Sequence, residues 1–233
     1  MATQPVDFCR EVETYLCRKN DGHLIRVTGP SFDLVSGWAA QGVPLKVAFK
    51  GIDRYFERYY AKGPRRRPVK IDFCEADVLD VFDEWRRATG VTAIEGVESQ
   101  IPNPKSLSLP AHLERVITRL TAARANGAIG DAFDAVIDRV ANELDAARSQ
   151  AHGLRGAARQ ALIERLAALD AELLGQARRL VDESERAALE READDELRAF
   201  RGGMTADAFA AAHRAAVDRL VRERFNLPTI TLG

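Results

Sequence analysis

The amino-acid sequence predicts a mainly α-helical protein of two domains, and three observations lead to this prediction. The 233 residues are 46% hydrophobic, which is typical of a globular chain with a sizeable core. Both tryptophans, all the tyrosines and all the cysteines lie within residues 1–90, whereas residues 111–225 are rich in the Ala, Leu, Arg and Glu of long helices. Between them, residues 90–110 contain three prolines and have no helical period. We therefore expect a first domain over 1–89, a linker over 90–110 and a helical domain over 111–233.

The first domain is expected to contain four helices and two short strands. Apolar residues spaced three or four apart predict the helices, and short alternating segments predict the strands. In chain order these elements are a helix over 6–19, a strand over 23–28, helices over 32–41 and 44–60, a strand over 69–73 and a helix over 76–87. Ser31 is a suitable cap for the second helix, and Gly42 lies where that helix should end.

The second domain is expected to be helical throughout, as a bundle or a long helical hairpin. Apolar stripes predict helices over 112–123, 129–147, 154–200 and 205–225, followed by an extended tail. The helix expected over 154–200 has a short coiled-coil-like seam of leucines: Leu162, Leu166, Leu169, Leu173 and Leu180. Such a seam is buried either inside a bundle or against a second copy of the chain or a protein partner.

The stretch WAAQGVPLKVAFKGI, residues 38–52, joins the second and third predicted helices. Its turn and the buried side of the next helix are formed by Gly42, Val43, Ala48 and Ile52. Together with the expected strands, this order resembles the winged helix-turn-helix DNA-binding superfamily over residues 6–73. The resemblance implies that the third helix lies in the DNA major groove. Pro44 takes the place of the usual polar cap, and Gly51 is expected to interrupt the helix.

A basic stripe runs along the third predicted helix. Its residues are four apart, so each step turns only about 40° around the helix and all of them share one face. The stripe consists of Lys46, Lys50, Arg54 and Arg58, and Arg65, Arg66 and Arg67 follow it between two prolines. Because lysine and arginine neutralise phosphates, we predict that these seven residues bind nucleic acid. The alternatives are a solvated helix face and a surface for an acidic protein partner.

No metal site, cofactor or catalytic residue is predicted. Cys9 and Cys17 are two helical turns apart, and His23 and Cys74 could approach them, but no closely spaced pair such as C-x₂-C is present. Motifs of phosphate-binding loops, nucleophile elbows and zinc proteases are missing. The carboxylates expected on an exposed face of the next helix are Asp77, Asp80 and Glu84. Carboxylates near a helix start favour its dipole, so we expect no enzyme; a metal-dependent nuclease is the enzymatic alternative.

Charge and hydropathy indicate the surroundings of the protein. The 34 basic and 35 acidic residues nearly cancel, so any basic surface must be local. No apolar run approaches the roughly 18 residues of a membrane span, and no signal peptide is visible. An odd number of cysteines without framework spacing suits a reducing cytoplasm. We therefore expect a cytoplasmic protein with no membrane partner.

The expected function is non-enzymatic DNA binding in a replication-accessory or transcription-regulatory role. A small DNA-binding module followed by a helical domain is similar to the layout of bacterial primosomal accessory proteins. Helix-turn-helix proteins usually read two half-sites, so a homodimer, or a protein partner, is expected through the helix over 154–200. The alternative is a helical protein–protein interaction adaptor whose basic face binds an acidic protein partner.

Overall fold

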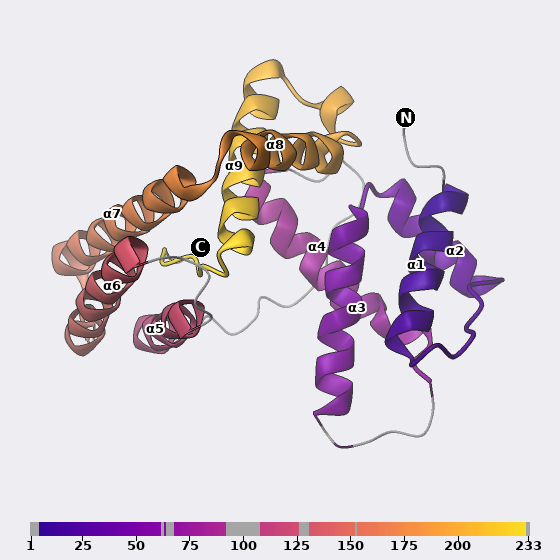
Figure 1. Ribbon diagram of the computed structural model, residues 1–233, viewed down its shortest axis with the longest axis horizontal. Helices are drawn as coiled ribbons and strands as arrows, with labels where there is room; N and C mark the ends of the chain where they lie inside the picture. Colours follow the sequence, from indigo (N-terminus) through magenta and orange to yellow (C-terminus); the bar gives the residue numbers. More distant parts are fainter. Residues whose placement is uncertain are drawn as a thin grey trace. The chain divides into compact units, whose positions relative to one another are not determined.

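The protein is mainly α-helical within the part of the chain that the structure describes (Figure 1). The computed structural model describes residues 5–61, 63, 68–91, 108–125, 131–151 and 153–231. The helices are α1 (Pro5–Lys19), α2 (Pro30–Ala40), α3 (Leu45–Tyr60), α4 (Glu75–Thr89), α5 (Leu109–Ala125), α6 (Asp131–Gln150), α7 (Gly156–Leu180), α8 (Glu183–Leu197) and α9 (Ala206–Arg224), with 3₁₀ turns η1 (Ile71–Cys74) and η2 (Arg201–Gly203). These described residues contain no β-strand.

The chain divides into two compact units, and neither is a single stretch of sequence. The first unit consists of Met1–Gly96 and Asp194–Ala215, and the second of Val97–Ala193 and Ala216–Gly233. The sequence predicts domains at 1–89 and 111–233, so the structure differs in assigning Asp194–Ala215 to the first unit. Most of the predicted linker, residues 92–107, lies outside the described residues.

Helix α3 is the centre of the first unit, where it contacts α1, η1 and α4. Its buried residues are Val47, Ala48, Gly51, Ile52 and Phe56. At the crossing with α4, a Cβ atom built on Gly51 would lie only 2.4 Å from the Cα atom of Val78. The prediction that Gly51 interrupts the helix is wrong, because α3 runs through this position. The missing side chain instead allows the two backbones to approach each other.

The strand predicted over 23–28 is wrong. This segment is irregular, and side chains of α1 take the hydrogen bonds that a second strand would have made. The N–H of Ile25 donates to Sγ of Cys17 at 3.2 Å, and the N–H of Val27 donates to the carboxylate of Glu13 at 2.7 Å. Because buried backbone groups need partners, these two side chains let the segment pack without a sheet.

The strand predicted over 69–73 is wrong for a related reason. The buried amide of Asn20 pairs with the backbone of Val69: it accepts from the N–H at 2.7 Å and donates to the carbonyl at 3.1 Å. The chain then forms the 3₁₀ turn η1. One side-chain amide thus replaces a neighbouring strand. Residues 23–28 and 69–73 are both described, and neither segment is a strand. The mainly α architecture is therefore confirmed, and the winged-helix form is not.

Helices α2 and α3 are joined by the tight turn that the sequence predicts. Gly42 has φ 79°, a left-handed conformation that favours glycine, and the N–H of Val43 donates to the carbonyl of Trp38 at 3.0 Å. The predicted cap is wrong, since α2 begins at Pro30 and the hydroxyl of Ser31 donates to Asp72 at 2.9 Å.

Residues from Asp194–Ala215 complete the core of the first unit. The ring of Phe200 is buried, with its centroid 5.6 Å from that of Trp85 and 6.4 Å from that of Phe82. The indole N–H of Trp85 donates to the buried carboxylate of Glu196 at 3.0 Å. These contacts join residues more than a hundred positions apart, so residues 1–89 alone lack part of their core.

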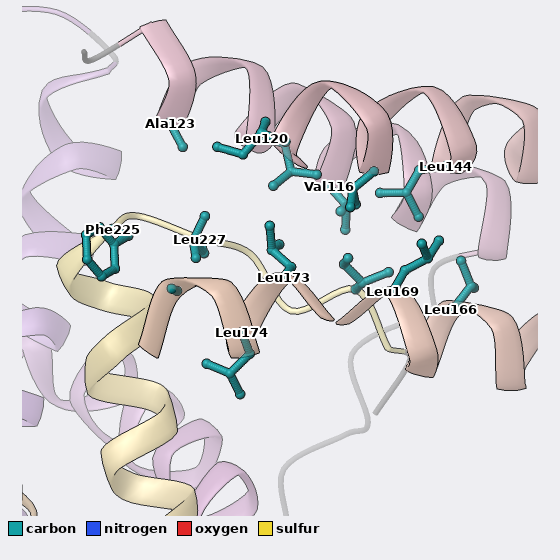
Figure 2. Close-up of a cluster of buried hydrophobic side chains, with 14 of the residues drawn as sticks. Val116, Leu120, Ala123, Leu144, Leu166, Leu169, Leu173, Leu174, Phe225 and Leu227 are labelled. Atoms are coloured by element: carbon teal, nitrogen blue, oxygen red, sulfur yellow. The ribbon is translucent and has the colours of Figure 1, made fainter. Parts of the chain in front are cut away.

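The second unit is a helical bundle with a leucine-rich core (Figure 2). Leu166, Leu169 and Leu173 of α7 point toward α5 and α6, where Figure 2 shows Val116, Leu120 and Leu144. The helical bundle that the sequence predicts is thereby confirmed. The buried leucines of the seam form part of its core. The exception is Leu180 at the end of α7, which is exposed.

The C-terminal tail belongs to this bundle. Ile230 is buried, its N–H donates to the carboxylate of Asp170 at 2.8 Å, and its carbonyl lies 2.9 Å from Nε2 of His112. Arg222 holds the same carboxylate at 2.6 Å. The extended tail is thus fixed to α5 and α7 by paired polar groups.

The single helix predicted over 154–200 is two helices, α7 and α8. Val181 is buried with an extended backbone (ψ 119°), which ends α7. Asp182 then starts α8, because its carboxylate accepts a hydrogen bond from the N–H of Glu185 at 2.8 Å. Asp182 and Glu185 have the D-x-x-E spacing of a capping box, a helix-start signal that the continuous apolar stripe obscured.

The close helix crossing leads to a first prediction. Replacing Gly51→Ala should lower the free energy of unfolding by about 1–3 kcal/mol, because the new methyl group overlaps the backbone of Val78. The matched control is Gly37→Ala in α2, where a Cβ atom meets nothing within 4 Å. That change should be neutral or stabilising by up to about 1 kcal/mol. Thermal or urea denaturation measures both variants, and equal stabilities would show that the crossing does not require glycine.

A second prediction concerns the contribution of Phe200 to the first unit. Phe200→Ala should destabilise this unit by about 3–5 kcal/mol, since it opens a cavity beside Trp85. Both tryptophans lie in this unit, so tryptophan fluorescence follows its unfolding in urea. Phe209→Ala, which removes a partly exposed ring in the same unit, is the control and should cost much less. An unchanged fluorescence transition for Phe200→Ala would mean that the unit folds without this residue.

Candidate functional site

The basic stripe lies on the exposed face of α3. Lys46, Lys50, Arg54 and Arg58 are all exposed. Lys46 and Lys50 occupy the side of the helix opposite Ala48 and Ile52, which are fully buried. Arg54 and Arg58 lie on the flank of α3 that adjoins α4, next to the buried Val47 and Gly51. The other predicted binding residues, Arg65, Arg66 and Arg67, lie outside the described residues.

Two of these cations are already paired with carboxylates of α4. Arg54 donates to Glu84 at 2.9 Å, and Arg58 donates to Asp77 at 2.6 Å. The hydrogen bond to Glu84 raises the pKa of Arg54 above its usual value, so this guanidinium remains charged. Lys46 and Lys50 also interact with neighbouring groups. The stripe is therefore a set of cations with internal partners, and an external anion has to compete for Arg54 and Arg58.

The two arginine pairs differ in burial. The side chain of Asp77 is only 6% exposed, although the sequence predicts it on an exposed face, whereas Arg58 is 63% exposed. Asp77 is buried because α4 turns it toward α3, next to the close crossing at Val78. Its charge needs the guanidinium of Arg58, since a buried carboxylate without a partner is costly. The pair of Arg54 and Glu84 is exposed on both sides.

Asp53 lies beside the stripe, but its carboxylate is paired with residues of α1 and not with the cations of the stripe. Its carboxylate accepts hydrogen bonds from the hydroxyl of Tyr15 at 2.7 and 2.8 Å and is 2.6 Å from Nζ of Lys19. The ring of Tyr15 stacks on Phe49 with centroids 4.0 Å apart. Burial and the bond to Asp53 raise the pKa of Tyr15 to about 12. Asp53 therefore ties α3 to α1 and reduces the field of the stripe less than its position in the sequence suggests.

An aromatic row lies at the C-terminal end of α3 and was missed by sequence reasoning. We use this name for Tyr55, Tyr59, Tyr60 and Phe73. The ring of Tyr55 is nearly parallel to that of Tyr59 (centroids 5.7 Å apart, planes at 21°) and to that of Phe73 (6.4 Å, 13°). Tyr60 meets Tyr59 edge to face at 5.4 Å. The guanidinium carbon of Arg58 lies 5.5 Å from the centroid of Tyr55, so the row adjoins the basic stripe.

The sequence contains a signal for this row. Tyr55 and Tyr59 are four residues apart, so they stack along a helix, and Arg58 lies between them. The strand predicted over 69–73 would have placed Phe73 away from this helix. The turn η1 instead brings Phe73 against Tyr55, while Phe73 remains 58% exposed and Tyr60 40% exposed.

The cysteines are held in separate places. Sγ of Cys9 is 3.5 Å from the hydroxyl of Ser36, Cys17 bonds to the backbone of Ile25, and Cys74 is buried. Burial, with the charge of Asp77, raises the pKa of the Cys74 thiol to about 12, so this thiol stays protonated at neutral pH. The described residues contain no group of three or more His, Cys, Asp or Glu side chains that could hold a metal ion.

No protein-family model, curated protein or solved structure matches the chain. None of the described helices is both long enough and apolar enough to pass through a bilayer.

The arginine pairs lead to a third prediction. Arg58→Ala should destabilise the protein by about 1–3 kcal/mol, because it removes a partner from a buried carboxylate. Arg54→Ala, the matched control, should cost less than about 1 kcal/mol, since its pair with Glu84 is exposed. Urea denaturation measures both. In an Asp77→Asn background the cost of Arg58→Ala should shrink, because no buried charge remains. Equal costs in the two backgrounds would show that Arg58 stabilises the protein through some other contact.

Proposed function

We propose that this chain is a non-enzymatic nucleic-acid-binding protein with a replication-accessory or transcription-regulatory role. One observation carries the proposal: α3 follows a tight turn after α2 and presents four exposed cations, of which Lys46 and Lys50 lie opposite its buried side. This is the placement of a recognition helix in helix-turn-helix proteins. The absence of strands among the described residues does not affect this argument, because it depends on α2, the turn and α3 alone.

In the proposed complex the cations have different roles. Lys46 and Lys50 lie on the N-terminal half of α3, where a recognition helix meets base edges and phosphates. Arg65 to Arg67 follow α3 in the sequence, flanked by prolines, and we assign them to the phosphate backbone, the role of a wing. Arg54 and Arg58 contribute less than their charge implies, because a phosphate has to displace Glu84 or Asp77.

A homodimer remains part of the proposal. The region 154–200 would have to use its outward side, since Leu166 and Leu173 are buried in the second unit. A protein partner could use the same side. The adaptor alternative, in which the basic face binds an acidic protein, becomes the preferred explanation if the chain does not bind nucleic acid.

The fourth prediction tests DNA binding by fluorescence anisotropy with a labelled duplex at several salt concentrations. Five contacts, by Lys46, Lys50 and the three arginines, imply a slope of log K against log salt of about −4 to −5. Replacing Arg65, Arg66 and Arg67 with alanine should flatten this slope by up to about three units, equally for every DNA sequence. The same three positions changed to lysine are the matched control and should keep the slope.

A further variant tests the competition within the protein. Glu84→Gln removes the charge that holds Arg54, so duplex affinity and the salt slope should both increase, the slope by up to about one unit. Lack of duplex and single-strand binding by the wild-type chain at about 50 mM salt would refute the proposed function.

A further inference from the structure

The exposure of the aromatic row has no explanation in the core of the first unit. Five large apolar side chains of the described residues are exposed, and two of these are aromatic: Tyr60 and Phe73. Both belong to the row. Their partners Tyr55 and Tyr59 are only half-buried, although they lie on the same side of α3 as the buried Ile52 and Phe56. The row therefore continues the apolar side of α3 beyond the core and leaves Tyr60 and Phe73 exposed to solvent.

The geometry of the row is that of an unfinished stack. Tyr55 has nearly parallel rings as neighbours, and Arg58 lies near its face. Phe73, the most exposed ring, ends the row on η1. A flat aromatic ligand can extend such a series by lying on the exposed ring, because offset parallel rings attract one another. Every nucleobase has the required π-face.

The charges near the row favour a polyanion. Residues 61–70 connect the end of α3 at Tyr60 to the start of η1 at Ile71. Their sequence is AKGPRRRPVK, which contains five cations and no carboxylate. Four carboxylates lie nearby in the sequence: Glu57, Asp72, Glu75 and Asp77. Asp77 is neutralised by Arg58 at 2.6 Å. Asp72, which accepts the hydroxyl of Ser31 at 2.9 Å, and the exposed Glu57 and Glu75 reduce the positive field. Aromatic rings that are joined in the sequence to a cationic segment match a ligand that offers bases and phosphates together.

We propose that the aromatic row binds single-stranded nucleic acid by stacking unpaired bases, with Phe73 as the exposed platform. This inference rests on the proposed function and names the ligand class. In a duplex each base is covered by its neighbours, so the row has no base face to contact and only the cations act. Unpaired bases offer their faces freely. The chain should therefore prefer single strands, or the junctions where single strands begin, over a continuous duplex.

The rings also distinguish a base from an apolar protein partner. A protein surface that packs on exposed Phe73 needs apolar contact of any shape, and leucine supplies that as well as phenylalanine does. Stacking requires a flat ring. Phe73→Leu and Phe73→Trp thus separate the two ligands at a position whose exposure keeps the cost to folding small.

The experiment measures the affinity of the full chain for a labelled single-stranded oligonucleotide of about 20 nucleotides and for the corresponding duplex, by anisotropy at about 50 and 200 mM salt. Stacking contributes about 1–3 kcal/mol for each base, so Phe73→Ala should weaken single-strand binding by roughly 5- to 150-fold. Phe73→Leu should weaken it as much as Phe73→Ala does. Phe73→Trp should bind at least as tightly as the wild type. Duplex affinity should change less than twofold in all three variants.

A second readout reports the contact directly. Both native tryptophans, Trp38 and Trp85, are buried, so iodide quenches their fluorescence poorly. The indole introduced by Phe73→Trp should be accessible to iodide in the free protein and protected in the presence of the single strand. Its fluorescence should fall on binding, since a stacked base quenches indole emission. Duplex DNA should leave this emission unchanged.

The outcomes separate this inference from the proposed function. Duplex binding without a preference for the single strand, or with unchanged single-strand affinity in Phe73→Ala, overturns the stacking inference and leaves the proposed function standing. Wild-type affinity in Phe73→Leu shows apolar contact and also overturns it. If neither nucleic acid binds at about 50 mM salt, both proposals fail. Normal melting temperatures of the variants exclude unfolding as the cause of lost binding.

Discussion

The close crossing of α3 and α4 at Gly51 and Val78 is the constraint on which the first unit depends. Because a Cβ atom at Gly51 would lie 2.4 Å from the Cα atom of Val78, the two helices are nearer than side chains would allow. This approach turns Asp77 toward α3 and buries it, and Arg58 must follow to neutralise it. The same packing sets which side of α3 is buried, and thereby which side presents its cations.

The electrostatics of the candidate site follow from this packing. A phosphate that binds Arg58 separates the guanidinium from a buried carboxylate, so part of the gained attraction is lost to the desolvated Asp77. At Arg54 the loss is smaller, because water can solvate Glu84. A row of four cations in a sequence therefore does not equal four phosphate contacts in a complex. In the proposed complex, binding that depends on charge alone would be moderate, and the proposed stacking on the aromatic row would add an attraction that salt does not screen.

Much of the fold could be predicted from periodicity, and the errors have local physical causes. The helices over 6–19 and 44–60 and the turn at Gly42 were correctly predicted, because apolar spacing and a left-handed glycine are local signals. The two strands were not correctly predicted. Alternation of apolar and polar residues indicates a half-buried extended segment, but it does not show whether that segment pairs with another strand or with side chains. Asn20 took the place of a strand through two hydrogen bonds to Val69. Which side chain would do this depends on tertiary packing.

The candidate site was predictable to a similar degree. The exposure of Lys50 and Arg54 followed from helical spacing, whereas the burial of Asp77 depended on the α3–α4 crossing and had no signal of its own in the sequence. Phe73 was read as part of a strand, so its contact with Tyr55 was missed. Such contacts join different elements, and single-sequence patterns describe only one element at a time.

The assignment of Asp194–Ala215 to the first unit, which the sequence did not predict, has a consequence for how α3 is held. Gly42 in the turn lies against the ring of Phe200, where an added Cβ atom would be 2.9 Å from Cζ. Its φ of 79° already favours glycine, so this residue is constrained both by conformation and by space. Phe200 also packs against Trp85 of α4. One ring from Asp194–Ala215 therefore touches the turn before α3 and the helix that crosses α3. The direction in which α3 presents its cations depends on a residue far along the chain, so α3 is held by the whole first unit and not by residues 1–89 alone.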